Sequence, residues 1–198
     1  TTNLDVVDID GAVDMASTLA VDGVVTISNG SYAAPAIAFA SDTDTGIARG
    51  GTNTLGFVSA GTLRFYTDPS SALATISAGT SNLTLGVNAG NSIASGGNYN
   101  TVVGDEAGTA ITTGDNNVAV GYASLAANIT ASDNTAVGKS ALAQNTTGAN
   151  NTAVGKSALN VNTTGTANVA VGSAALDANT TGGYNVGIGD RALGANTT

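Results

Sequence analysis

A 17-residue repeat occupies the second half of the chain and restricts its possible folds more than any other feature. The clearest unit, 134–150, reads NTAVGKSALAQNTTGAN, and a looser copy that is one residue longer starts at Asn82. Internal repeats of this size are typical of solenoids, in which each unit stacks on the next. The 17-residue units begin with an asparagine at Asn100, Asn117, Asn134, Asn151, Asn168 and Asn185.

Each repeat reads as a short strand, a glycine turn, a second short segment and then an Asn/Thr/Gly turn. The fifth position is always glycine, and most units end in an Asn-Thr-Thr-Gly cluster or a variant of it. Glycine and asparagine tolerate positive φ and therefore mark bends. In the strand 168–172, a period of two places Val169 and Val171 on one face and Ala170 on the other. We therefore predict one β-solenoid coil per repeat, with valine facing inward and alanine facing outward.

Coils of this kind would stack at about 4.8 Å, so six coils would make a rod about 29 Å long. An aspartate in place of Val154 should then destabilise the rod, because it would bury an unpaired charge. Each coil has few large side chains to bury against the entropy of ordering it. This deficit suggests a second burial surface between chains. We expect the alanine face to supply it in a homotrimer, although a dimer or a monomer remains possible.

The composition excludes several functional classes. The chain has no histidine, cysteine or tryptophan, and its net charge is −9, with 14 acidic against five basic residues. The five cations are scattered, whereas nucleic-acid binding needs basic clusters. No apolar run is long enough to insert into a membrane. Disulfides are impossible, and the commonest catalytic base and the thiol nucleophile are missing. We expect no enzyme activity, no cofactor, no catalytic residue and no metal site.

The chain divides into three segments, all predicted to be β-structure, turn and loop. Residues 1–34 carry short apolar runs between Asp-Gly turns at 10–11 and 22–23. Residues 35–81 should contain strands at 36–39, 54–58 and 62–66, joined by polar, glycine-rich links. Residues 82–198 hold the tandem repeats. The chain begins without methionine and ends within the repeat pattern, so we expect it to belong to a longer polypeptide.

The segment 36–65, AIAFASDTDTGIARGGTNTLGFVSAGTLRF, resembles a segment of tailed-bacteriophage tail fibre proteins. There, an Asp-Thr-Asp-Thr-Gly-Ile core precedes Asn-Thr-Leu-Gly-Phe-Val and a Gly-Thr-x-Arg strand. The repeats of 82–198 are similar to tandem NTAVG-type repeats of the same fibres, and more distantly to the head repeats of trimeric autotransporter adhesins. The resemblance implies an elongated homotrimeric fibre on a virion that serves host attachment.

Two acidic groups could suggest calcium. Asp8 and Asp10, with Asp5 and Asp14 nearby, lack the glutamate that an EF-hand loop needs at its twelfth position, where Ser17 stands. Turns between strands explain this group better, and we interpret Asp42 and Asp44 in the same way.

Asn-x-Ser/Thr sequons could suggest glycosylation, but they recur with the coil period, which favours turn-building asparagines. They lie at Asn29, Asn82, Asn128, Asn145, Asn162, Asn179 and Asn196.

The stacked threonines could suggest an ice-binding array, but adjacent threonines in a strand point to opposite faces, which leaves one outward threonine per coil. They are Thr146, Thr163, Thr180 and Thr197. Asp105 and Glu106 form a carboxylate pair, which we interpret as solvated surface.

The leading hypothesis is a rigid spacer of a phage tail fibre, located extracellularly on the virion. Its partners would be two further copies of the chain, other tail or baseplate proteins, and a host receptor bound through regions outside this segment. The alternatives are a bacterial surface adhesin or filament subunit and, less favoured, a polysaccharide-degrading tailspike.

Overall fold

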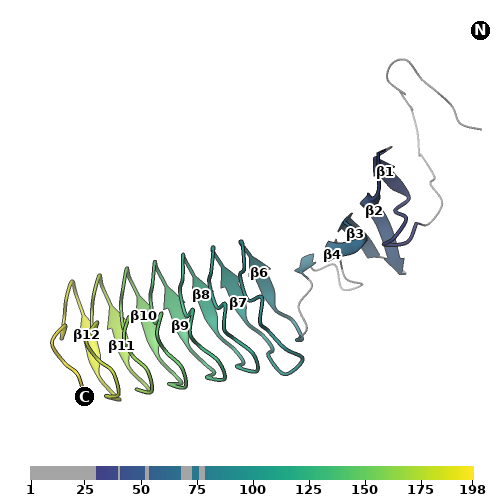
Figure 1. Ribbon diagram of the computed structural model, residues 1–198. Coiled ribbons are helices and arrows are strands. Elements are labelled where there is room, and N and C mark those ends of the chain that lie inside the picture. The colour runs from purple at the N-terminus through teal and green to yellow at the C-terminus, as the bar shows by residue number, and fades with distance from the viewer. Residues whose placement is uncertain (1–29, 40, 52–53, 68–72, 76–78) are drawn as a thin grey trace, which may run out of the picture.

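The computed structural model describes residues 30–39, 41–51, 54–67, 73–75 and 79–198. All regular structure in these ranges is β-strand, and it forms two sheets (Figure 1). Strands β1–β5 form an antiparallel sheet in sequential order, and strands β6–β12 form a parallel sheet of seven strands. The prediction of an all-β chain is confirmed for the described residues.

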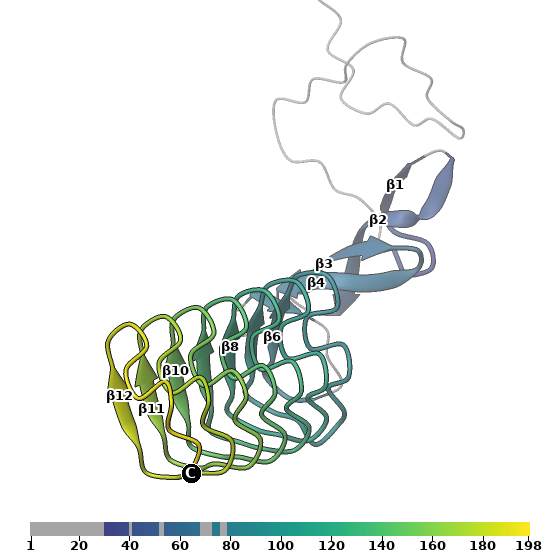
Figure 2. The same cartoon turned by 60° about the vertical axis from the view of Figure 1, so that its left-hand side comes forward.

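The parallel sheet is one wall of a β-solenoid of about six turns, which confirms the predicted coil per repeat (Figures 1 and 2). Each strand has three residues and occupies positions two to four of its unit, in register with the next unit, as in the pairs Ala136 with Ala153 and Ala153 with Ala170. The strands are β6 (Leu83–Leu85), β7 (Thr101–Val103), β8 (Val118–Val120), β9 (Thr135–Val137), β10 (Thr152–Val154), β11 (Val169–Val171) and β12 (Val186–Ile188).

The inward position of the strands is mainly alanine, so the prediction that valine faces inward is wrong, apart from Val102, which is fully buried. The alanine at position three is fully buried in four successive coils, from Ala119 to Ala170, whereas Val154 at position four is 36% exposed. The other buried apolar side chains of these coils are the leucine at position nine, the alanine at position eight from Ala141 onward, and Ala131. Alanine therefore packs inside the coil and valine faces outward.

The short distance between opposite walls explains this inversion. In the last coil, glycine replaces alanine at position three, and a methyl group added to Gly187 would lie 3.1 Å from Cγ of Leu176. The leucine from position nine thus reaches across the coil almost to the strand backbone. Only a methyl group fits between them at the close packing of a protein interior. Strand alternation separates the two faces, but the width of the coil decides which of them is inside.

The glycine at position five makes the bend that the sequence predicts. At Gly155 φ is +135°, which side chains rarely adopt, and an added Cβ would lie 2.4 Å from the carbonyl oxygen of Gly172 in the next coil. Glycine is therefore required both by its conformation and by the closeness of the overlying backbone.

A ladder of buried asparagines, which the sequence pattern did not predict, connects all the units. The ladder runs through the first residue of each unit, from Asn82 to Asn185. Oδ1 of Asn151 accepts hydrogen bonds from the backbone N–H of Asn168 at 3.0 Å and from its Nδ2 at 3.1 Å. Nδ2 of Asn168 also donates to the carbonyl of Gly182 at 2.8 Å. Among the described residues, no buried side-chain nitrogen or oxygen lacks a partner.

The first two coils fill their interior differently from the later ones. In both, position nine is glycine and position twelve is isoleucine, and Ile93 and Ile111 are buried. From Leu125 onward, leucine at position nine takes over the apolar filling, and position twelve becomes a buried asparagine. These asparagines form a second ladder, in which Nδ2 of Asn162 donates to Oδ1 of Asn145 at 2.9 Å.

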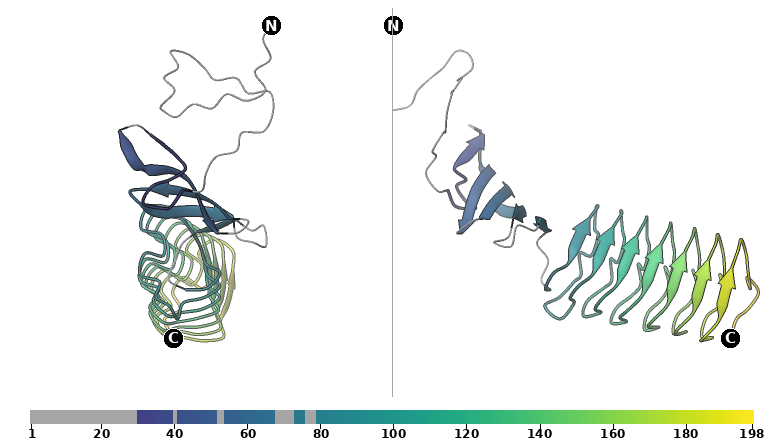
Figure 3. Two further views of the ribbon diagram at one scale, coloured as in Figure 1. Left: turned by 90° about the vertical axis from the view of Figure 1, so that its right-hand side faces the viewer. Right: turned by 180° about the vertical axis from the view of Figure 1, so that it is seen from behind.

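The antiparallel sheet is an up-and-down arrangement of β1 (Ile37–Phe39), β2 (Asp42–Gly51), β3 (Thr54–Ser59), β4 (Thr62–Thr67) and β5 (Leu73–Thr75). It is seen from two further sides in Figure 3. The three strands predicted in this segment are present as β1, β3 and β4. The segment predicted to be a polar link is instead β2, the longest strand of the sheet. Its glycine-rich sequence suits close pairing, because a Cβ at Gly46 would overlap the carbonyl of Ile37.

Candidate self-assembly surface

The outer side of the seven-stranded sheet is the surface most suited to association, and we call it the valine face. It consists of the outward positions two and four of each unit, so its side chains form two parallel columns along the solenoid. Its members are Leu83, Leu85, Thr101, Val103, Val118, Val120, Thr135, Val137, Thr152, Val154, Val169, Val171, Val186 and Ile188.

The valine face carries no charged residue, although the chain as a whole is strongly acidic. Its members are aliphatic except for the threonines of β7, β9 and β10. Most charged side chains of the solenoid lie at the bend after the strand, as do Lys139 and Lys156 at position six, and the others, Asp115, Asp133 and Asp177, lie in the remaining turns. The Nζ atom of Lys139 lies 5.6 Å from the ring centroid of Tyr122 in the preceding coil. Charges are thus absent from the outer surface of the sheet.

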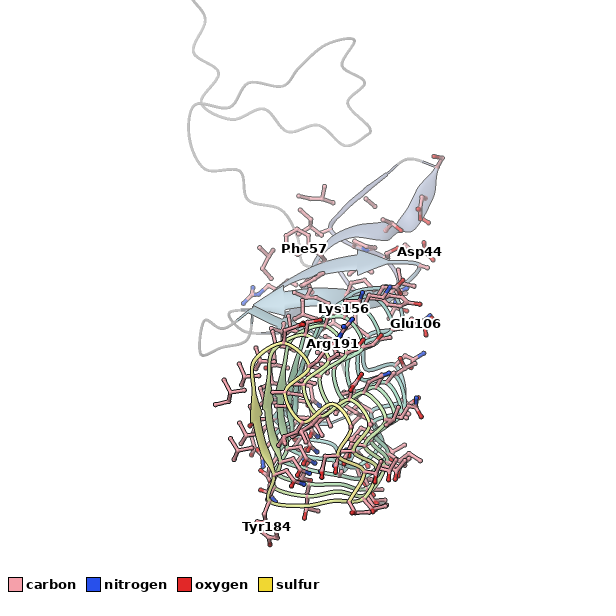
Figure 4. All side chains as sticks on the ribbon, turned by 90° about the vertical axis from the view of Figure 1, so that its left-hand side faces the viewer. Asp44, Phe57, Glu106, Lys156, Tyr184 and Arg191 are labelled. Atoms are coloured by element: carbon pink, nitrogen blue, oxygen red, sulfur yellow. The ribbon has the colours of Figure 1, made fainter. Side chains whose placement is uncertain are left out.

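Stacking alone covers part of this surface. In the middle of the solenoid, Val120, Val137 and Val171 are half-buried because the coils above and below them lie at the strand spacing of about 4.8 Å. Strand β12 pairs with β11 on one side only, and Ile188 in it is 70% exposed. Figure 4 shows the solenoid in projection along its length, with Tyr184 of the last coil pointing outward into solvent. A partly exposed strip of mainly aliphatic side chains is a feature of association surfaces.

The predicted inter-chain role of alanine is therefore corrected. The methyl groups of Ala136, Ala153 and Ala170 are fully buried inside their own chain and are inaccessible to another. The outward columns of the same strands are valine and threonine.

The asparagines of the sequons build turns, as the sequence analysis favoured. Asn145 is fully buried, and its Nδ2 donates to the carbonyl of Gly148 at 2.8 Å and to Oδ1 of Asn128 at 3.1 Å. Asn162 and Asn179 repeat these bonds one and two coils further on. An amide nitrogen in this environment is inaccessible to a glycosylating enzyme in the folded chain. Asn29 lies outside the described residues.

The stacked threonines at position thirteen use their hydroxyl groups within the solenoid. Oγ1 of Thr146 donates to the carbonyl of Thr163 at 3.0 Å, and Oγ1 of Thr163 donates to that of Thr180 at 3.0 Å. The exposed threonine of each of these turns is the next residue, as at Thr147 and Thr164. Each such turn thus presents a single column of exposed threonines, in agreement with the expectation of one per coil.

The acidic residues have two different settings. Asp42 and Asp44 lie in strand β2, so their assignment to a turn is wrong. The pKa of Asp44 is raised above its ordinary value, first by a hydrogen bond with the side chain of Asp42, then by loss of hydration and by the charge of Asp42. Asp105 and Glu106 are exposed at the bend after β7, as expected for solvated surface. Asp5, Asp8, Asp10 and Asp14, which were interpreted as turn residues between strands, lie outside the described residues.

No group of three or more potential metal-ligating side chains occurs in the described part of the chain. Within the same residues, no helix could cross a membrane.

Comparisons with known proteins give no relative for this chain: no protein-family model, no curated protein and no solved structure matches it.

Sequence reasoning missed both the asparagine ladders and the outward direction of the valines. The ladder had a detectable signal, because an asparagine that recurs at the same position of every coil stacks on its own copies, and stacked asparagines form hydrogen-bonded ladders. The direction of the valines had a weaker signal in the leucine at position nine. A coil this short has room for one column of large side chains, and that column already occupies the interior.

Proposed function

We propose that this chain is a structural segment of an extracellular fibre, in which the solenoid acts as a rigid spacer and copies of the chain pack side by side through the valine face. The observation that carries the proposal is the uncharged aliphatic strip on the outside of a coil whose own interior holds mainly alanine, leucine and asparagine. A strip of this kind gains free energy when a second apolar surface covers it.

Stiffness is supported by the repetition of identical bonds in every layer. Successive coils are connected by the strand ladder, by the asparagine ladder at position one and, from Asn128 onward, by the second ladder at position twelve. Bending the rod would stretch all three sets of bonds on one side together. The role assigned to the chain is mechanical: it provides length and rigidity, without catalysis or a cofactor.

Three copies around an axis parallel to the rod would each turn the valine face toward that axis. The number three and the assignment to a phage tail fibre come from the resemblance of residues 36–65 and of the repeats to tail fibre segments. In this proposal the chain is part of a virion and contacts other tail or baseplate proteins. A receptor-binding region elsewhere in the fibre would contact the host surface.

The packing surface is tested with two matched double variants. Val137→Asp with Val154→Asp places two carboxylates on the valine face, and Thr147→Asp with Thr164→Asp places the same charge on exposed turns. We expect the first variant to dissociate to the 19.0 kDa single chain in size-exclusion chromatography with light scattering, and the second to keep the mass of the unmodified protein. Equal masses for both variants would contradict the proposed surface.

The biological assignment needs a different experiment. An antibody raised against the solenoid should label fibres on phage particles in immuno-electron microscopy. Labelling of a bacterial surface in place of virions would favour the adhesin or filament alternative and would contradict the tail-fibre assignment.

A further inference from the structure

The antiparallel sheet carries a row of large apolar side chains across four strands, on one face. The strand register places Ile37 opposite Ile47, Ile47 opposite Phe57, and Phe57 opposite Phe65. Directly opposed residues of antiparallel strands share a face and lie within about 5.5 Å of each other. We call these four residues the cross-strand apolar row. Leu55 joins it on the same face, because it lies two residues from Phe57 in β3.

The opposite face of this sheet is the one that the chain covers itself. Ala48, Val58 and Leu63 are buried there, and Tyr32 packs against them. The row is left open: Ile37 and Phe57 are each 47% exposed and Leu55 is 46% exposed. An antiparallel sheet with one covered face normally has polar side chains on the other. Phe57 is marked on this sheet in Figure 4.

The size of the valine face indicates what covers the row. Seven strands at about 4.8 Å and three residues at about 3.3 Å give the valine face an area of about 300 Å². A stable association buries about 800 Å² on each partner. If copies of the chain associate as proposed above, the valine face alone is too small, and further apolar area must come from elsewhere in the chain. In the described residues, the cross-strand apolar row is a further open apolar surface, and it contains two aromatic rings.

We propose that the cross-strand apolar row is a second self-association surface, on which the same row of another copy packs. This inference rests on the proposed assembly through the valine face and names its aromatic anchors. Aromatic side chains contribute disproportionately to association because each buries 150–250 Å², the approximate range for one ring. The side chains of the row itself are uncharged, and the charged residues next to it in β2 and β4 are Arg49 and Arg64, so the surface carries none of the acidic groups that give each copy its net charge of −9.

The direct test uses the absence of cysteine from the chain, which makes any introduced thiol unique. Leu55→Cys places a thiol at the edge of the row, and the control Thr147→Cys places one on an exposed turn of the solenoid. Mild oxidation of the full-length chain should give covalent dimers in non-reducing gels with Leu55→Cys, at least tenfold more than with Thr147→Cys. Equal cross-linking of the two variants would overturn the inference.

A second variant measures the contribution of the aromatic anchor. Phe57→Ser should raise the concentration at which the assembly dissociates by at least tenfold, while circular dichroism and the melting temperature of the solenoid stay unchanged. An unchanged dissociation concentration would overturn the inference, even if the valine-face variants still dissociate the assembly. In that case the proposed function would stand. A wild-type chain that is monomeric at all concentrations would instead contradict the proposed function, and this inference with it.

Discussion

Asn151 is bonded to Asn134 of the preceding coil through two of its donors. Its backbone N–H and its Nδ2 both donate to Oδ1 of Asn134, at 3.0 and 3.2 Å. One side-chain oxygen thus fixes both the backbone and the side chain of the next layer. Because both residues are fully buried, the bond is shielded from water and also sets the register of the coils.

The first prediction concerns this ladder. Asn151→Asp should destabilise the solenoid by about 3–5 kcal/mol, because it buries a carboxylate against Oδ1 of Asn134 and the carbonyl of Gly165. The control Asn150→Asp changes the adjacent, exposed residue, whose φ of +60° aspartate tolerates. Chemical denaturation followed by circular dichroism measures both. Similar denaturation midpoints for Asn151→Asp and Asn150→Asp would contradict the role of the ladder.

The second prediction separates the inward and outward sides of one strand. Ala153→Asp should unfold the coil or cost at least about 3 kcal/mol, because it inserts volume and charge at a fully buried position. Val154→Asp should change the stability of the single chain by less than about 1 kcal/mol and act on association instead. Thermal unfolding at low concentration, where the chain is a single copy, makes the comparison. The reverse order of stability would restore the inward valine that the sequence suggested.

The third prediction uses two glycines with the same backbone conformation. Gly155 has φ +135° and Gly189 has φ +121°, but an added Cβ meets the carbonyl of Gly172 at 2.4 Å in the first case and no atom closer than 3.9 Å in the second. Both alanine variants suffer backbone strain, and only Gly155→Ala also pushes two coils apart. We expect Gly155→Ala to lower the melting temperature by several degrees more than Gly189→Ala. Equal melting temperatures would show that the strain alone matters.

The fourth prediction tests whether the two kinds of coil interior are interchangeable. A Cβ at Gly108 would lie 2.8 Å from Cδ1 of Ile111 and 3.1 Å from Cγ1 of Val102, so Gly108→Leu alone should destabilise the second coil. The triple variant Val102→Ala, Gly108→Leu, Ile111→Asn copies the later coils and should recover most of the lost stability. Comparing the unfolding free energies of the single variants with that of the triple variant gives a coupling free energy between the substitutions. We expect this coupling free energy to be about 1 kcal/mol or more. If the losses of stability from the single substitutions simply added up in the triple variant, the two kinds of coil interior would not be interchangeable.

Sequence reasoning reached the architecture because the repeat fixes it. The bends were predicted from the invariant glycine at position five, as at Gly138, and from the Asn-Thr-Thr-Gly turn. The strand was predicted from its period of two. The inward face of the strand was predicted wrongly because Val154 is more hydrophobic than Ala153. In the narrow coil, the size of the side chain decides which residue fits inside. Strand β2 was missed because Ile47 and Ala48 are its main apolar residues, and pairing on both edges stabilises it.

The asparagine ladder and the cross-strand apolar row depend on contacts between distant residues. Asn134 and Asn151 can each be read as turn residues, and only stacking turns them into mutual partners. Similarly, Ile37 and Phe57 form one row only once β2 lies between their strands with Ile47 in register. A sequence in which β2 is assigned to a link contains no such row.

The central claim is that this chain associates with copies of itself, and the mass of the unmodified protein in solution tests it most directly. Size-exclusion chromatography with multi-angle light scattering should give three times the chain mass of 19.0 kDa. The mass should persist on dilution until the assembly dissociates as a unit. A single-chain mass at every concentration, with the valine face exposed to solvent, would contradict the account.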